Sequence, residues 1–240
     1  MASDTKNNLR VDSRSNNDFR PFLARADINS HFSGSIEFSQ GNTRVLANTS
    51  ITQTESRSEP LQVVLNTTSL NSACKTPADF PRFNNQLAAA SFFVPNLILT
   101  STQDLSLEGL KLEMEICPLC DDGGLLSSSI MGSWVSLYHA LRWAALNKLI
   151  SSDLALRQVV ALEFTYQDKE LLIDPAQQEL AESEQSSLLI VDEEYRVVGA
   201  NLASNYEIVK AGELSVNLEA LKPQIDNLLE IQRNVLQQSL

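Results

Sequence analysis

The sequence predicts an α+β fold of two layers, in which mixed and antiparallel sheets pack against long helices. In several segments apolar residues alternate with polar ones, as in half-buried strands, and in others they recur at helical spacing. These segments follow the order strands, helix, strand, helix, strands, helix, which is typical of the α+β class. With 240 residues and 43% hydrophobic content, the chain is long enough for one generous core or two small ones.

The chain divides into a short arm and one domain. Residues 1–18 are rich in Asn, Ser and Asp and lack an apolar pattern, so we expect a flexible N-terminal arm and no secretory signal. Order is expected to begin near Phe19. Residues 19–240 contain no linker and no repeat of fixed period, which indicates a single domain.

Residues 22–66 are predicted to form strands. Ile36 and Phe38 alternate with polar residues ahead of the turn "SQGN", and residues 43–51 continue as the second strand of a hairpin with a glycine at its tip. Residues 61–66, "LQVVLN", predict a further strand.

A loop, a helix and a strand come next. Residues 67–82 have two prolines and no period, so they predict a loop. A helix of about three turns follows, with Asn84 or Asn85 able to cap its start. Residues 110–119, "LKLEMEICPL", alternate strictly and predict a half-buried strand.

The second half of the chain is predicted to contain two long helices and several strands. Residues 127–146 place apolar side chains on one helical face, and residues 217–240 do the same, with Pro223 in the first turn or at a kink. Strands are predicted at residues 156–166, 169–174, 186–192 and 194–203, the last two as a hairpin around "DEEY".

Charge and hydropathy exclude several classes of protein. The formal net charge of -12, with a pI near 4.6, argues against a protein that coats nucleic acid with its whole surface, so RNA contact needs a local basic patch. No apolar run approaches the roughly 20 residues of a membrane span, so we expect no membrane partner.

The cysteines favour no metal site. Cys117 and Cys120 have the CxxC spacing of a metal or redox pair, but a structural zinc site has four ligands. Only Cys74, His31 and His139 remain as soft ligands, and they are scattered along the chain. Buried thiols at the end of a strand are therefore the preferred interpretation.

The stretch "LCDDGGLLSSSIMG", residues 119–132, raises the question of a phosphate site. Backbone amides at a glycine turn that opens a helix attract anions. A turn with an acidic start is the commoner meaning of this pattern, and Asp121 and Asp122 would repel an anion at close range. The stretch matches neither a Walker loop nor a dinucleotide fingerprint.

Four segments together resemble the RNase PH family. They are "RVDSRSNNDFRPF", "GSIEFSQGNTRVLANTSI", "DDGGLLSSSIMGSWVSLYHAL" and "LLIDPAQQEL", which occur in the family's order and at about its spacing. The resemblance runs from about Arg10 to the C-terminus, with residues 67–110 matching only in outline. It implies an RNase PH-like domain over residues 19–240, as in bacterial phosphorolytic exoribonucleases and the ring subunits of the RNA exosome.

Active family members imply three features for phosphorolysis, and each is degraded here. Where the family has a polar Thr-Arg cradle for phosphate, this chain has Leu125 and Leu126, followed by serines at 127 and 128. Side chains of leucine cannot donate hydrogen bonds to phosphate. Where the family has an Arg pair ahead of the first long helix, this chain offers Arg82 alone.

The third feature is a carboxylate segment of the form D-x-x-x-x-E-D. Asp174 and Glu179 stand at matching positions, but Leu180 replaces the final Asp. The resemblance therefore assigns no catalytic residue, and Asp174 and Glu179 are interpreted as turn and helix-cap groups. The chain is predicted not to be an enzyme and to have no metal or other cofactor.

Arginines are the candidates for RNA contact. In "RVDSRSNNDFRPF" the resemblance implies that Arg10, Arg14 and Arg20 approach RNA or a neighbouring subunit. An equally weighted alternative is that they pair locally with Asp12 and other carboxylates and fasten the arm to the domain. Arg44 is either a solvated strand residue or part of a basic channel lining; together with Arg82 these are the five candidates.

The resemblance implies a catalytically inactive ring subunit of a eukaryotic RNA exosome, which scaffolds the barrel that guides RNA to a nuclease for 3′-5′ processing and degradation. The implied partners are paralogous RNase PH-like subunits in a hetero-hexameric ring, RNA-binding cap proteins, a hydrolytic nuclease and RNA. The implied location is the nucleus, including the nucleolus, and the cytoplasm. An active phosphate-dependent 3′-5′ exoribonuclease and a non-RNA interaction module on the same fold stay open as alternatives.

Overall fold

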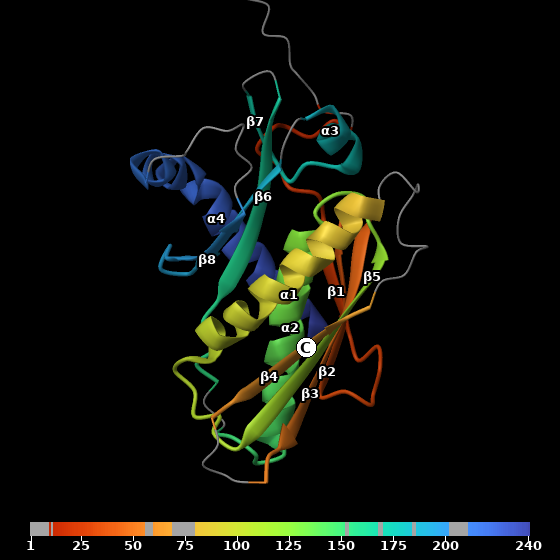
Figure 1. The fold of residues 1–240 in the computed structure, drawn as a ribbon, viewed down its shortest axis with the longest axis vertical. Helices are drawn as coiled ribbons and strands as arrows, with labels where there is room; N and C mark the ends of the chain where they lie inside the picture. Colours follow the sequence, from red (N-terminus) through yellow and green to blue (C-terminus); the bar gives the residue numbers. More distant parts are fainter. Residues whose placement is uncertain are drawn as a thin grey trace, which may run out of the picture.

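Two β-sheets pack around helix α2 in the computed structural model, which describes residues 10, 12–55, 60–68, 80–151, 154–167, 170–183, 186–201 and 211–240 (Figure 1). This mixture of sheets and long helices confirms the predicted α+β class. In chain order the elements are β1 (Phe22–Ala26), β2 (Gly34–Gln40), β3 (Thr43–Gln53), β4 (Gln62–Thr67), α1 (Phe80–Thr102), β5 (Leu110–Cys120), α2 (Leu125–Leu146), β6 (Val159–Gln167), β7 (Glu170–Ile173), α3 (Gln177–Glu182), β8 (Ser186–Asp192), β9 (Val197–Asn201) and α4 (Ala211–Ser239).

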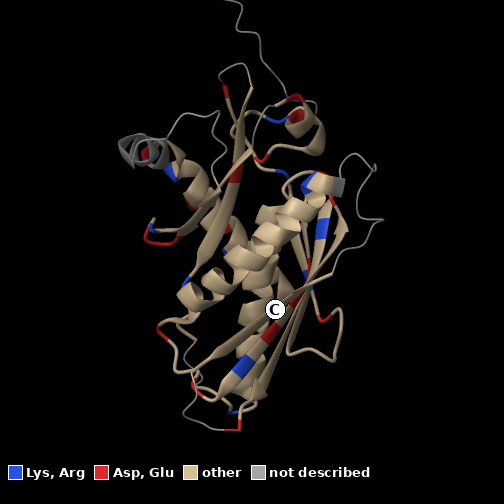
Figure 2. Cartoon of the chain, viewed as in Figure 1, with Lys and Arg blue, Asp and Glu red and all other residues tan. Residues whose placement is uncertain are grey.

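The first sheet has five strands in the order β1-β2-β3-β5-β4 and is antiparallel except where β4 pairs with β5. The predicted hairpin is confirmed, since β2 pairs with β3 around Gly41, whose φ is +60°. β5 confirms the predicted alternation from Leu110 to Ile116, where the apolar residues are buried and the charged ones between them are half-buried. These charged residues form the blue and red bands along β5 in Figure 2.

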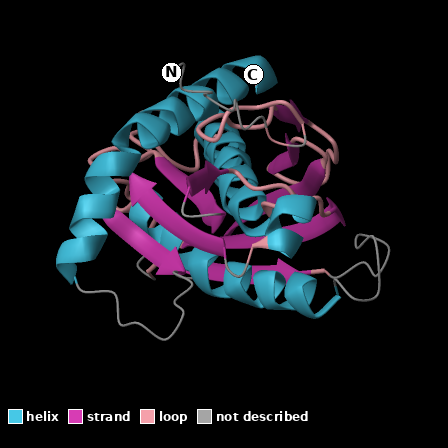
Figure 3. Cartoon of the chain, turned by 90° about the horizontal axis from the view of Figure 1, so that it is seen from above, coloured by secondary structure: helices cyan, strands magenta, loops and turns pink. Residues whose placement is uncertain are grey.

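The second sheet has four strands in the order β7-β6-β8-β9, and all its pairs are antiparallel. The predicted hairpin around "DEEY" is confirmed as β8 and β9. α4 packs against β1 of the first sheet and β6 of the second, while α1 packs against β4 and β9. Figure 3 shows helices on both sides of the strands. The helices thus join the two sheets into one body. No helix among the described residues is long and apolar enough to cross a membrane.

Helix α2 is buried on all sides over its first half, which corrects the prediction of a single apolar face. Every residue from Leu125 to Leu137 is buried, because β2 and β3 lie against the helix and β6 and α1 contact it as well. Small side chains make this possible, since close packing leaves no room for larger ones. At Gly34 of β2, an added Cβ would lie 2.3 Å from the carbonyl oxygen of Ser136.

The predicted starts of α1 and α4 both need correction. α1 begins at Phe80, so Asn84 and Asn85 lie inside it and the loop predicted over residues 67–82 ends earlier. Pro81 explains this start, because proline is favoured in the first turn, where its missing N–H is not needed. Residues 69–79 of that loop lie outside the described residues.

α4 and α3 also differ from the prediction. α4 begins at Ala211, so Pro223 lies in the helix interior and the first-turn alternative is wrong. The short helix α3 was not predicted, because six residues give too few turns for a periodic pattern. α3 follows β7 directly and so places Glu179 beside the end of that strand.

We predict that Gly34→Ala destabilises the protein by about 1–3 kcal/mol, because the new methyl group meets backbone atoms of α2 that cannot move independently. Denaturation in urea would show a lower midpoint than for wild type. Ser50→Ala, on the opposite face of the same sheet, is the control and should leave the midpoint nearly unchanged. An unchanged midpoint for Gly34→Ala would contradict the close approach of β2 and α2.

Candidate functional site

The glycine turn, residues 121–124, leads from β5 into α2 and is enclosed by protein. Both glycines have a positive φ, +89° and +75°, a conformation that favours glycine. The N–H of Gln177 donates to the carbonyl of Asp122 at 2.9 Å. A Cβ on Gly123 would lie 2.6 Å from the carbonyl oxygen of Pro175. The corner between β7 and α3 therefore closes over the turn.

The side chains that follow the turn are either apolar or already hydrogen-bonded. Leu125 and Leu126 are buried, at 1% and 4% exposure. The hydroxyls of Ser127 and Ser128 both donate to Oε1 of Gln40, at 3.1 and 2.9 Å. These four side chains thus form part of the core and do not present a polar cradle to a phosphate.

Arg20 and Asp174 form a buried ion pair beside the turn. Their side chains are 5% and 1% exposed, and both Nε and a terminal nitrogen of Arg20 donate to the carboxylate. Nε2 of Gln40 donates to the same carboxylate at 2.7 Å. The guanidinium also donates to the carbonyls of Asp122 (2.8 Å) and Gly123 (3.1 Å). One arginine therefore joins the glycine turn to the end of β7.

Glu179 is held in a second buried pair. Arg10 donates to both of its carboxylate oxygens, and the amide of Ala176 donates to Oε2 at 2.7 Å. Burial raises the pKa of Glu179, but the bonds from Arg10 and Ala176 outweigh it and hold the pKa below its usual value. The bond to Ala176 confirms Glu179 as a cap of α3.

The three arginines of the predicted arm pair with groups of the domain, as the second of the two alternatives proposed. Arg10, Arg14 and Arg20 all donate to groups of the β7–α3 corner, so contacts with the domain begin at Arg10 rather than at the expected Phe19. Residues 1–9 and 11 of the predicted arm lie outside the described residues. Contact of these arginines with RNA stays a prediction.

Arg44 lies apart from this corner. It is exposed on the outer face of β3, and one terminal nitrogen of its guanidinium lies 3.8 Å from Oε1 of Glu37. Leu180 is half-buried on α3. Neither residue reaches the pocket described below, so the sequence-predicted residues are only partly brought together.

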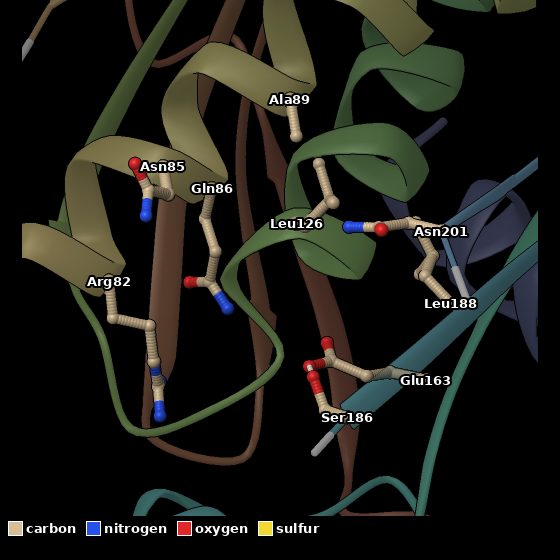
Figure 4. A pocket seen from close by; sticks show the side chains of 9 residues that line it. All are labelled: Arg82, Asn85, Gln86, Ala89, Leu126, Glu163, Ser186, Leu188 and Asn201. Carbon is tan, nitrogen blue, oxygen red and sulfur yellow. Dashed lines mark hydrogen bonds between the residues drawn. The ribbon is translucent and has the colours of Figure 1, made fainter. Parts of the chain in front are cut away.

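A pocket of about 190 Å³ lies between α1, the start of α2 and the second sheet (Figure 4). Its rim and walls combine amide, charged and apolar side chains from five elements. They are Arg82, Asn85, Gln86 and Ala89 of α1, Leu126 of α2, Glu163 of β6, Ser186 and Leu188 of β8, and Asn201 of β9.

Glu163 is the charged residue of this pocket that sequence reasoning missed. It is 3% exposed, and its nearest hydroxyls, Ser186 and Ser127, lie 3.3 and 3.4 Å from it. Burial raises the pKa of Glu163 from 4.5 to about 7, although Arg82 and Arg20 oppose the shift. The available signal was a lone charge within the apolar run "VVALEFTY".

Arg82 is the only charged residue in α1 and points into the pocket (Figure 4). Its side chain is 31% exposed, and one terminal nitrogen lies 3.3 Å from the buried carboxylate of Asp121. Asp121 is in turn bonded to the amide of Gly123 at 3.0 Å. The one cation of the pocket is thus already paired with an acid of the glycine turn.

No group of three or more His, Cys, Asp or Glu side chains that could hold a metal ion occurs among the described residues. Cys117 and Cys120 are free thiols near the end of β5, as predicted, but both are half-buried rather than buried. Burial raises the pKa of the Cys117 thiol. Cys74 lies outside the described residues.

The arrangement of two sheets around a buried helix is that of the RNase PH class of fold. Rice (Oryza sativa) Rrp46 is similar in structure, with a TM-score of 0.67 at 17% identity over 95% of this chain and 100% of that one. The archaeal exosome core gives 0.66 at 16% identity over 97% and 91%. The Archaeoglobus fulgidus exosome with RNA bound to the active site gives 0.68 at 18% identity over 96% and 92%.

The amino-acid sequence, compared with models of protein families, shows the family of this chain. Residues 18–142, more than half of the 240, match domain 1 of the 3′ exoribonuclease family, and the chain belongs to this RNase PH family. The matched region includes the hairpin, Arg82 and the glycine turn. It ends before Glu163 and the carboxylates at 174 and 179.

We predict that Asp174→Asn lowers the free energy of unfolding by about 3–5 kcal/mol, because it leaves the buried charge of Arg20 without its counter-ion. Chemical denaturation would measure this loss. Asp12→Asn removes the exposed partner of Arg14 and is the matched control, expected to cost at most about 1 kcal/mol. Equal effects of the two changes would contradict a special role for the buried pair.

A second prediction concerns pH. Because the pKa of Glu163 is about 7 in the folded protein and lower in the unfolded chain, its contribution to stability is present below about pH 4.5 and is lost as pH rises through 7. Glu163→Gln should therefore gain stability relative to wild type between pH 5 and 8, by at most about 3 kcal/mol.

The measurement is the unfolding free energy of both proteins at pH 5 and pH 8. Glu108→Gln, an exposed change of the same kind, controls for the loss of one negative charge. A difference between Glu163→Gln and wild type that does not vary with pH would show that this carboxyl does not titrate in that range.

Proposed function

We propose that this chain is a catalytically inactive ring subunit of an RNA exosome core, which scaffolds a barrel that guides RNA to a nuclease. Its membership of the RNase PH family supports this proposal, as does its structural likeness to archaeal exosome subunits and rice Rrp46 over nearly the whole chain. The family includes enzymes, so the argument for inactivity rests on the site.

The observation that carries the proposal is the engagement of both carboxylates of the β7–α3 corner. Asp174 and Glu179 are bound to Arg20 and Arg10 in buried pairs. Phosphorolysis needs a positioned phosphate, a group that neutralises developing charge and a proton donor. Leucines follow the glycine turn, so no side chain there can position a phosphate. Arg82, which could neutralise developing charge, is already paired with Asp121.

The proposed partners are paralogous RNase PH-like subunits in a hetero-hexameric ring, RNA-binding cap proteins and a hydrolytic nuclease, with RNA passing through the channel. The proposed location is the nucleus, including the nucleolus, and the cytoplasm. A net charge of -12 is compatible with this role if other subunits supply most of the basic channel lining.

One observation favours a second candidate, a phosphate-dependent 3′-5′ exoribonuclease. Glu163 and Arg82 line one pocket, and a carboxyl with a pKa of about 7 suits a general acid at neutral pH. In this candidate Glu163 replaces the missing final carboxylate of the family segment, and phosphate binds beside Arg82.

The test is affinity purification of the tagged chain from its native cells, followed by mass spectrometry. We expect the other ring subunits, cap proteins and a nuclease in near-equal amounts. In a parallel assay, the purified chain should release no nucleoside diphosphates from RNA when phosphate is added.

A self-assembled ring that trims RNA only with phosphate would replace the scaffold proposal by the enzyme. In that case Glu163→Gln and Arg82→Ala should each lower the rate by about 10²-fold or more, while Arg142→Ala, at an exposed position of α2 outside the candidate sets, serves as the control. Recovery of partners unrelated to an RNA-degrading ring would instead favour an interaction module.

A further inference from the structure

A groove of about 480 Å³ lies between α4 and the segment that leads into β1. Residues of α4 that are four, three and four positions apart line one wall of it, and these are Asn227, Ile231, Asn234 and Gln238. At this spacing they form a single stripe along one face of the helix. Residues 18–22 form the opposite wall. We call this site the α4 groove.

Three amide side chains of this stripe are available to a ligand. Asn227, Asn234 and Gln238 are exposed, and none of them makes a hydrogen bond with another residue of the part of the chain that the structure describes. Each amide offers a donor and an acceptor. Asn234 and Gln238 are about 6 Å apart along the helix axis. In an extended chain, backbone groups on one edge recur at every second residue, about 6.6 Å apart. The amides are therefore spaced to bond to an extended backbone.

Apolar side chains complete the α4 groove. Phe19, Phe22 and Ile231 are half-buried, and Val235 between them and the core is buried. The rings of Phe19 and Phe22 lie 6.0 Å apart and are tilted by 59°. Successive side chains of an extended peptide point to opposite faces. Every second side chain of such a peptide can therefore contact this apolar surface while its backbone bonds to the amides.

The charged groups of the α4 groove are already paired within the chain. Arg14 and Arg20 each form an ion pair with an aspartate. The carboxylate of Asp18 accepts from the backbone N–H of Ser15 at 2.9 Å. Binding of nucleic acid depends on cations that neutralise its phosphates. The groove therefore favours an uncharged ligand over RNA.

We propose that the α4 groove binds an uncharged, extended peptide segment of another protein, with the amides of α4 bonded to its backbone. The stripe from Asn227 to Gln238 is about 16 Å long, which is the length of about five extended residues. The inference goes beyond the proposed function, because it does not depend on whether the chain forms part of a ring. Recovery of the wrong partners in the affinity purification leaves it unaffected.

The experiment is an NMR titration of the full-length, isotope-labelled chain with a capped hexapeptide in which serine and valine alternate. The side-chain NH₂ resonances of Asn227, Asn234 and Gln238 report on the groove directly, and each is assigned by its loss in a variant. Because the contact area is small, we expect weak but saturable binding that shifts these resonances. Absence of such shifts up to about 5 mM peptide would overturn the proposal.

A parallel titration with an oligouridylate separates a peptide site from an RNA site. We expect the RNA to leave the three side-chain resonances in place, because the cations of the α4 groove are paired. Shifts of the same resonances by RNA but not by peptide would assign the groove to RNA and refute the peptide proposal.

Two methylated forms of the peptide test whether its backbone is bound. One carries a methyl group on the peptide nitrogen of every valine, and the other on that of every serine. Each form removes the N–H donors along one edge of the extended chain, because successive residues direct their backbone groups to opposite edges. At least one form should therefore fail to bind. Equal binding of all three peptides would show that only apolar contacts hold the peptide.

Variants of α4 test the amides. Asn234→Leu and Gln238→Leu each remove an amide at similar size and should weaken peptide binding about fivefold. Gln237→Leu is the matched control, because Gln237 is an exposed neighbour that does not line the groove, and it should bind like wild type. All three positions face solvent or the groove, so the melting temperature should stay that of wild type. Full binding by both Asn234→Leu and Gln238→Leu would refute the role of the amides.

Discussion

The buried pair of Arg20 and Asp174 is the interaction on which the rest of this structure depends. Its guanidinium reaches two carbonyls of the glycine turn, and its carboxylate accepts from Gln40 of β2. Gln40 in turn accepts from the serines that open α2. One ion pair therefore sets the position of the N-terminal segment, the β2–β3 hairpin, the start of the buried helix and the end of β7.

The same kind of pairing occupies both carboxylates of the corner between β7 and α3. Buried charges are tolerated only with partners, and the carboxylates of Asp174 and Glu179 both have arginine partners here. What survives beside the corner is a small pocket with one shared cation, one acid that is difficult to ionise and apolar walls.

Local patterns predicted the elements well but not their surroundings. The alternation in β5 needs only neighbouring residues to be read, and the hairpin at Gly41 follows from turn chemistry. The burial of α2 on all sides depends on contacts with strands that are distant in the sequence. Its serines and glycine were therefore expected on the exposed face of the helix, because such contacts leave no local pattern. Glu163 was missed because a single charge in a strand has no periodic signal, and the partners of Arg10 depend on topology alone.

The long separation between the arginines and their acids has a consequence for synthesis on the ribosome. Arg10 and Arg20 pair with residues 169 and 154 positions later in the chain. At ordinary rates of translation, the first half of the domain waits on the order of 10 s before those acids are made. During that interval the guanidinium groups of Arg10 and Arg20 have no access to the carboxylates that hold them in the finished domain, so the N-terminal segment cannot take its final place until the second sheet has been made.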